Sequence, residues 1–364
     1  MSSNFDQARE FFMQGLAHFQ AGRYADAERD YAASLALLPG RGSTLTNLGA
    51  TRLILGRPAA ALEALDEAVA AEPDNEQALG HRATALAELG QSEAAMACVD
   101  RLLQLAPRLG HAWSLRGRLL KERGERAQAA SAFSSAIAYG ADAELNGYFL
   151  ASVSERAAPA APPRHYVENL FDGYADDFDQ HLVGVLKYQA HEVLVGRLRA
   201  MERRFERALD LGCGTGLCGA LVRPLARWLE GVDLSSKMVA QARARGIYDE
   251  LRQADLVEWL GAASPGCDLV IAADVFIYVG ALDTVFASVA RLLDAGGVFC
   301  FSVEEAGPGE DFAVRPSLRY VHSPDYLRRL AARNGFELDA LERHPIRQDQ
   351  QVPIPGLFAW FTRH

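Results

Sequence analysis

Residues 208–220 read ALDLGCGTGLCGA and hold four glycines and two cysteines within thirteen positions. Glycines at this density allow a tight turn and a close approach of the backbone to a ligand. The two cysteines, Cys213 and Cys218, suggest a second interpretation, because thiolates bind metals and carry out redox chemistry. An ordinary turn between a strand and a helix is the third. The surrounding sequence decides among them.

Short apolar runs alternate with helical patterns around this loop. The runs are RALDL, WLEGV, LRQA, DLVIAA and VFCFSV, and each is typical of a buried strand. Two more strands are expected near 336–343 and 357–362, after a helix in SPDYLRRLAARNG. Strands that alternate with helices predict a parallel sheet covered on both faces. The sequence therefore predicts an α/β domain with a seven-stranded sheet and the glycine loop after its first strand.

Acidic residues stand at the ends of the expected strands, where ligands bind in such sheets. Asp233 ends the second strand and suits both hydroxyls of a ribose, but it suits the N-cap of the helix in DLSSKM equally well. Asp255 ends the third strand, where the same choice lies between an adenine amino group and a helix cap. Asp274 ends the fourth strand.

Four motifs, DLGCGTG, GVDLS, QADL and DLVIAADVF, occur in order. Together they resemble the class I S-adenosylmethionine-dependent methyltransferases over about residues 165–364. The loop reads D-x-G-x-G-x-G rather than the dinucleotide-binding G-x-G-x-x-G, which favours S-adenosylmethionine over NAD. The resemblance implies a Rossmann-like methyltransferase domain, S-adenosylmethionine as methyl donor and S-adenosylhomocysteine as product.

The resemblance also implies which residues bind the cofactor. The glycine loop lines its methionine part, Asp233 holds the ribose, Met238 lies against the adenine, and Asp255 with Leu256 borders the adenine edge. A lid in FDGYADDFDQHL, residues 171–182, precedes the first strand, and its family pattern of tyrosine, two residues and proline is replaced here by YQAH with His191. The full expected set is Tyr174, Asp210, Gly212, Cys213, Gly214, Gly216, Asp233, Leu234, Met238, Asp255, Leu256, Ala273 and Asp274.

The cysteines then have a simpler explanation. Cys213 is common at its place in this loop of the family, and Cys218 falls in the first helix, where it is expected to pack. A metal site needs more ligands, and no cluster of histidines or cysteines flanks the loop. No metal is predicted.

Candidates for the acceptor side follow the fourth and fifth strands and occupy a late loop. His322 is the first choice for a general base, with Tyr278 and Glu304 beside it. The alternative for His322 is a surface position before the helix cap Ser323, and for Glu304 a solvated loop charge. Arg347 suits an acidic substrate or simply contact with water.

A different pattern fills the first part of the chain. Glycine recurs at Gly22, Gly56, Gly90 and Gly124, each 34 residues after the one before. With small residues and prolines at the same period, the pattern resembles the tetratricopeptide repeat over about residues 8–143 as four repeats. A closing helix is expected in 142–156. The predicted domains are the array, 1–156, a Pro/Ala linker, 157–164, and the methyltransferase domain, 165–364.

Composition limits the setting and the partners. The net charge is −10, so no positive excess favours nucleic acid. The N-terminus lacks a secretory pattern, no apolar run is long enough to span a membrane, and five cysteines are few and odd in number. These features predict a cytoplasmic protein with reduced thiols.

Three functions fit the sequence. The first is methyl transfer to a small molecule, the second is methylation of a protein that the repeats recruit, and the third is a scaffold that only binds S-adenosylmethionine. Apolar positions expected on the inner face of the repeats, such as Phe12, Met13, Leu53 and Ile54, suit a partner helix or a second subunit. Packing between repeats explains them equally well.

Overall fold

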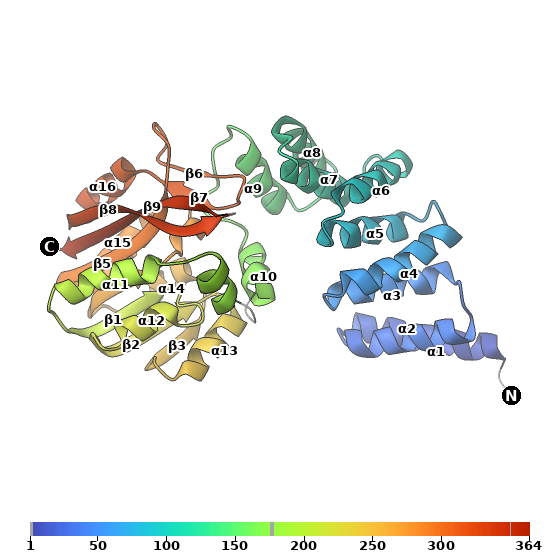
Figure 1. Cartoon of the computed structure of the whole chain (residues 1–364), viewed down its shortest axis with the longest axis horizontal. Helices are drawn as coiled ribbons and strands as arrows, with labels where there is room; N and C mark the ends of the chain where they lie inside the picture. Colours follow the sequence, from blue (N-terminus) through green and yellow to red (C-terminus); the bar gives the residue numbers. More distant parts are fainter. Residues whose placement is uncertain (1–2, 175–177, 350) are drawn as a thin grey trace. The chain divides into compact units, whose positions relative to one another are not determined.

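The computed structural model describes residues 3–174, 178–349 and 351–364. The chain divides into two compact units, Met1–Ser154 and Glu155–His364 (Figure 1). Each unit is built on a different principle. The first repeats a helical pair, and the second wraps helices around one sheet.

The first unit is an array of antiparallel helix pairs. Each helix packs against the next one along the chain. Its helices are α1 (Asn4–Gln20), α2 (Tyr24–Leu37), α3 (Gly42–Ile54), α4 (Pro58–Ala71), α5 (Glu76–Glu88), α6 (Ser92–Leu105), α7 (Gly110–Glu122), α8 (Arg126–Ala138) and α9 (Ala143–Val153). The four pairs and the closing helix α9 confirm the predicted helical repeats.

The 34-residue period has a direct structural cause. The glycine after each first helix has a φ between +70° and +77°, which side chains rarely tolerate. Within the pairs, small residues face large ones: a Cβ on Gly15 would lie 2.8 Å from the Tyr31 ring, and one on Gly117 would lie 2.5 Å from Phe133. The two helices of a pair therefore approach closely only because these positions lack side chains.

The second unit holds one mixed sheet. Its strands are β1 (Phe205–Leu211), β2 (Ala226–Asp233), β3 (Glu250–Gln253), β4 (Cys267–Ala272), β5 (Leu293–Glu305), β6 (Phe312–Val314), β7 (Tyr320–His322), β8 (Phe336–Asp349) and β9 (Val352–Arg363). The seven expected strands form the order β3-β2-β1-β4-β5-β9-β8, parallel from β3 to β5 and antiparallel at β9 and β8.

Two short strands were not predicted. The hairpin of β6 and β7 joins the last two residues of β5, Glu304 and Glu305, beyond the point at Phe301 where the pairing with β4 ends. It places the segment 312–322 beside the carboxyl ends of the parallel strands. Residues expected in a loop therefore lie in regular structure.

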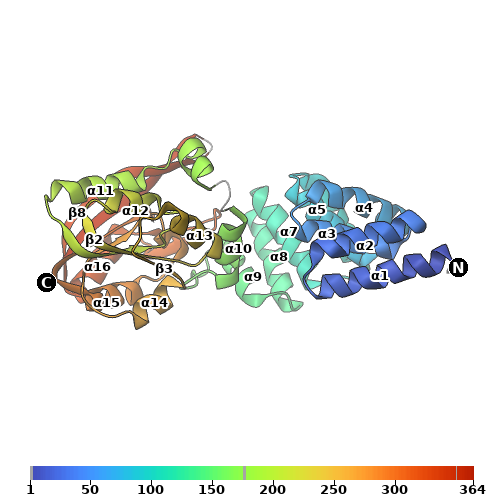
Figure 2. The same ribbon diagram turned by 90° about the horizontal axis from the view of Figure 1, so that it is seen from below.

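Helices cover the sheet on both faces (Figure 2). One apolar core joins the sheet to α14 (Leu256–Ala262), α15 (Asp283–Leu292) and α16 (Pro324–Arg333). The other joins it to α11 (Ala190–Ala200) and α12 (Leu217–Val222). The remaining helical segments are α10 (Arg164–Tyr174), η2 (Gln180–Val185), α13 (Ser236–Arg245) and η3 (Phe276–Tyr278). None of the helices in the described ranges is both long and apolar enough to cross a bilayer.

The expected linker packs against the sheet domain through Pro159 and Ala160, in its first half. The Ala160 carbonyl accepts hydrogen bonds of 2.9 Å from the backbone N–H groups of Gly280 and Ala281. The Tyr320 hydroxyl donates to the Pro159 carbonyl over 2.9 Å. Backbone carbonyls of this segment therefore accept hydrogen bonds from donors on the sheet domain.

We predict that a fragment of residues 155–364 folds alone and is more stable than a fragment of residues 164–364. The shorter fragment loses the bonds to Pro159 and Ala160, and each such bond is worth about 0.5–1.5 kcal/mol. Urea unfolding followed by circular dichroism measures the difference. Equal unfolding midpoints for the two fragments would show that the segment contributes nothing to the sheet domain.

Candidate functional site

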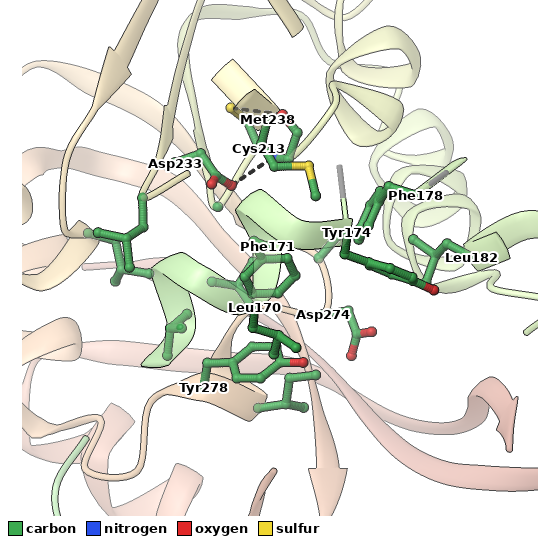
Figure 3. Close-up of a pocket in the computed structure, with 18 of the residues that line it drawn as sticks. Leu170, Phe171, Tyr174, Phe178, Leu182, Cys213, Asp233, Met238, Asp274 and Tyr278 are labelled. Atoms are coloured by element: carbon green, nitrogen blue, oxygen red, sulfur yellow. Dashed lines mark hydrogen bonds between the residues drawn. The ribbon is translucent and has the colours of Figure 1, made fainter. Parts of the chain in front are cut away.

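A pocket of about 710 Å³ opens at the carboxyl ends of the parallel strands of the second unit. Gly212 and Gly214 follow β1, Asp233 ends β2, Asp255 follows β3, and Asp274 follows β4, and all of them line it. Figure 3 shows Cys213, Asp233 and Met238 at one end of this pocket, Tyr278 at the other, and Phe171 and Tyr174 between them. The topology thus gathers residues that are far apart in the chain.

The glycine loop leaves room that side chains would fill. Gly212 and Gly214 have φ values of +61° and +53°, in the left-handed region. A Cβ on Gly212 would lie 2.6 Å from Val275, so the close passage of the two loops requires glycine there. A Cβ on Gly214 would meet only Phe178, at 3.9 Å across the pocket. This bare backbone fits a ligand that lies directly against the loop.

Asp233 ties the end of β2 to the loop. One carboxylate oxygen accepts from Gly214 N over 2.8 Å, and the other accepts from Ser235 N over 2.9 Å. Burial raises the pKa of Asp233, while these backbone hydrogen bonds oppose the rise. The N-cap of α13 is Ser235 and not Asp233, since the Ser235 hydroxyl accepts from Met238 N. The alternative of a helix cap is therefore wrong for Asp233, and its contact with a ribose remains a prediction.

Asp255 does cap a helix. Its carboxylate accepts from the backbone N–H groups of Val257 and Glu258 over 2.9 and 3.0 Å, at the start of α14. Asp255 and Leu256 nevertheless line the pocket, as do Leu234 and Met238. Capping and a place beside a ligand are thus compatible for this residue.

Two residues of the expected cofactor set lie outside the described pocket lining. Asp210 is 1% exposed and accepts a hydrogen bond of 2.7 Å from the Tyr248 hydroxyl, while its other oxygen has no partner among the described residues. Gly216 begins α12 with a φ of +94° and faces Arg245 and Tyr248. Both residues lie behind the loop in this structure, and their contact with the cofactor remains a prediction.

Cys213 and Cys218 line the pocket as buried thiols. Burial, reinforced by nearby carboxylates, raises the pKa of both well above the usual value. A thiol that holds its proton is a poor nucleophile and a poor metal ligand. In the described ranges, no group of three or more histidine, cysteine or acidic side chains is arranged for a metal.

The expected lid lies over the pocket, although residues 175–177 of it are outside the described ranges. Phe171 packs edge-on against Tyr278 with ring centroids 5.1 Å apart, and Tyr174 packs against Phe178 at 5.5 Å. Asp172 accepts from the Ser235 hydroxyl, which joins α10 to α13. Opening of this segment on ligand release remains a prediction.

A buried cation organises the other end of the pocket. Arg347 is 2% exposed and donates to both carboxylate oxygens of Asp274, over 2.8 and 2.7 Å, and to Glu304. The two carboxylates raise the pKa of Arg347 against the opposing effect of burial. This pairing was not predicted; it depends on a shift of register in β8 between Pro345 and Gln348. That irregularity buries the adjacent residues Ile346 and Arg347, which strict alternation forbids.

The structure corrects two of the three proposed catalytic residues. His322 lies in β7, is fully buried and outside the described pocket lining, and its Nε2 lies 2.8 Å from the Gly280 carbonyl. Burial lowers its pKa to about 4, so it accepts protons poorly. Glu304 is buried against Arg347 and is likewise outside the lining. Tyr278 is the one of the three that lines the pocket.

His191 has a structural role in place of the family's proline. Its ring stacks on Tyr188 with centroids 5.0 Å apart and an angle of 4°. Tyr188 is buried and lines the pocket. Sequence analysis missed Tyr188, although it is the tyrosine of the pattern that His191 closes.

Comparisons with known proteins agree with this geometry. Residues 209–299 match the family described as "Methyltransferase domain", and residues 52–119 match "Tetratricopeptide repeat". The second unit is a class I S-adenosylmethionine-dependent methyltransferase domain. The whole chain is thus a methyltransferase with an N-terminal tetratricopeptide region.

Several proteins are similar to parts of this methyltransferase. Malonyl-(acyl-carrier protein) O-methyltransferase of Enterobacter lignolyticus is 29% identical over 197 residues, which are 53% of this chain and 76% of that protein. FK506-binding protein-like of Mus musculus is 34% identical over 109 residues, so 28% of this chain spans 31% of that protein. The structure of magnesium protoporphyrin IX methyltransferase from Synechocystis PCC 6803 with bound SAM is 20% identical, with 57% of this chain and 100% of that chain covered and a TM-score of 0.44.

We predict that Asp233→Ala weakens binding of S-adenosylhomocysteine to the methyltransferase about 10- to 100-fold, because it removes hydrogen bonds to a charged group. Calorimetry measures the affinity. Asp249→Ala is the matched control, since its carboxylate also accepts from a backbone N–H, that of Leu229 at 2.7 Å, but lies outside the described lining. Unchanged affinity in the Asp233 variant would remove this residue from the cofactor site.

A second prediction concerns pH. Burial raises the pKa of Asp210 to about 7, against the opposing Tyr248 hydrogen bond. In the unfolded chain the value is about 3.9, so protonation of Asp210 favours the folded state. The contribution of Asp210 to the free energy of unfolding is fully present below its pKa in the unfolded chain, and it is lost as the pH rises through about 7. As the pH rises from about 4 to above 7, the free energy of unfolding of the wild type should fall, and that of Asp210→Asn should fall less. The difference between them should reach about 4 kcal/mol, because a pKa shift of about three units is worth about 1.4 kcal/mol per unit.

Chemical unfolding at several pH values measures this difference. Asp249→Asn is the control. Burial raises the pKa of Asp249, but hydrogen bonds from Leu229 N and Arg223 outweigh it, and the pKa is lowered overall. Its effect should appear only in acid. Parallel pH profiles for the wild type and Asp210→Asn would contradict the raised pKa.

Proposed function

We propose that the methyltransferase transfers the methyl group to a small molecule that binds beside the cofactor in this pocket. The observation that carries the proposal is the pocket itself. Its 710 Å³ lies within the range of about 300–1,000 Å³ that is usual for small-molecule sites. Apolar side chains such as Leu170, Phe171, Ile277 and Val279 line much of it.

The cofactor end fits S-adenosylmethionine. Bound there, S-adenosylmethionine supplies a methyl group that its sulfonium already activates for displacement by a nucleophile. Gly212 and Gly214 offer bare backbone to the methionine part, Asp233 offers carboxylate oxygens to the ribose, and Met238 and Leu256 offer apolar contact to the adenine. These assignments come from the family resemblance and are supported by the position of each residue in the lining.

The chain's own contribution to the reaction is positioning and exclusion of water. Phe171, Tyr174 and Phe178 form an aromatic cover, in which each ring packs edge-on against another. Tyr278 packs against Phe171 of this cover and offers a hydroxyl to the pocket. His322 and Glu304 are bonded to other partners and are not free to act as a general base.

A protein acceptor recruited by the repeats is the second candidate. Phe12 packs on Tyr31 and Leu53 packs in the array core, but Met13 and Ile54 are 54% and 50% exposed. Exposed large apolar side chains on the first helices of two repeats are suited to a partner helix or a second copy of the chain.

We predict that methyl-labelled S-adenosylmethionine, incubated with the full-length protein and cell extract, labels small molecules rather than protein bands. Ultrafiltration followed by chromatography of the filtrate, with electrophoresis of the retained protein, separates the two products. Asp233→Ala should lose the label, while Asp249→Ala should keep it. Label confined to protein bands would favour the second candidate, and loss of that label in Met13→Ser with Ile54→Ser would assign recruitment to the repeats.

A further inference from the structure

Three arginines line the pocket, and two of them are already paired. Arg347 is held by Asp274 and Glu304. Arg164 lies 3.3 Å from the exposed carboxylate of Glu258. Arg319 makes neither an ion pair nor a side-chain hydrogen bond with any residue in the described ranges. Of the three arginines, Arg319 is therefore the one whose guanidinium N–H groups are available to bind a ligand.

The β6–β7 hairpin fixes where Arg319 stands. Its carbonyl accepts from Arg315 N over 2.9 Å, and Leu318, with a φ of +60°, donates to the Arg315 carbonyl over 2.8 Å. The next residue, Tyr320, is fully buried. Arg319 comes directly before β7, and its half-buried side chain reaches the pocket.

The positive charge of Arg319 is not neutralised by a directly bonded carboxylate among the described residues. Asp274 and Glu304 share Arg347, which satisfies both carboxylates directly. Burial raises the pKa of Glu304, and Arg347 and, more weakly, Arg319 act against this rise. Glu304 therefore attracts Arg319 at a distance but is bonded elsewhere. An incoming anion competes only with this long-range attraction.

Much of the pocket lining is apolar. Pro162, Leu170, Leu186, Ile277 and Val279 line the pocket with Arg319. A half-buried guanidinium at such a wall favours a ligand with one anionic group and an apolar body. Guanidinium presents parallel N–H groups that match a carboxylate with two hydrogen bonds.

We propose that the methyl acceptor is an apolar carboxylic acid whose carboxylate binds Arg319. This proposal rests on the proposed small-molecule function and names the class of its substrate. The carboxylate sets the orientation of the acceptor, and the apolar wall buries the rest of it. Arg319 is thus a binding residue that determines specificity.

The test uses full-length protein saturated with S-adenosylhomocysteine. The probes are octanoate and 3-phenylpropionate, each paired with its primary amide, which keeps the shape and removes the charge. We expect the acids to bind at least about 10-fold more tightly than the amides, as for a charged hydrogen-bonded pair. Calorimetry measures each affinity.

Variants locate the effect. Arg319→Gln should remove the preference for the acids, and Arg319→Lys should retain part of it, because lysine keeps the charge but not the paired donors. Arg315→Gln is the matched control in the same hairpin, since Arg315 pairs with Glu310 outside the described lining. It should behave as the wild type.

Two results would overturn the proposal: no preference for the acids in the wild type, or the same preference in Arg319→Gln. The affinity for S-adenosylhomocysteine is measured first in every variant. Failure at that step would count against the methyltransferase site itself. Normal cofactor binding without an acid preference would reject only the role of Arg319.

Discussion

The buried pairing of Arg347 with Asp274 and Glu304 is the interaction on which the acceptor side of the pocket depends. It joins the ends of β4, β5 and β8, which the sheet hydrogen bonds bring together without fixing their loops. A buried charge that loses one partner typically costs about 3–5 kcal/mol, so all three side chains are constrained together. Arg347 therefore has a structural role in the site, and its donors are already occupied by Asp274 and Glu304.

The same pairing holds a strained backbone. Asp274 has a φ of +59°, which costs a residue other than glycine about 1–3 kcal/mol unless its surroundings hold it. Its N–H donates to the Ser302 hydroxyl over 2.9 Å, and its carboxylate is bound by Arg347. With both ends of the residue fixed, the chain can turn from β4 directly into the pocket wall at Val275 and Tyr278.

The cofactor half of the site was predictable because its signals are local. The glycine loop and the acids Asp233 and Asp255 each follow a strand within a short motif, and parallel strands bring their carboxyl ends to one edge. The helical repeats were predictable for a similar reason, since one period repeats the same contacts. The contacts of all these residues with the cofactor remain predictions, and Asp210 and Gly216 lie behind the loop rather than in the pocket lining.

The other half of the pocket was not predictable, because its contacts join residues that are far apart in the sequence. Arg347 is buried by an irregularity in β8 that begins at Pro345, and a proline in a strand does not by itself tell which of the next residues is buried. His322 was expected in a loop, but a three-residue strand against β6 buries it. The Pro/Ala segment reads as a spacer, yet Gly280, Ala281 and Tyr320 supply donors to its carbonyls. In each case tertiary packing outweighs the local pattern.

This contrast has a physical basis in what each half must do. The cofactor half recognises one molecule through backbone and strand ends, which a single sheet topology provides. The acceptor half is assembled from segments that reach the sheet from outside it: the chain near Pro162, the hairpin that carries Arg319, and the irregular end of β8. None of these segments is needed to close the sheet, so their side chains can differ while the fold and the methyl donor stay the same. The proposed selectivity for the acceptor therefore depends on packing between distant segments and on the charge left uncompensated among them, at Arg319.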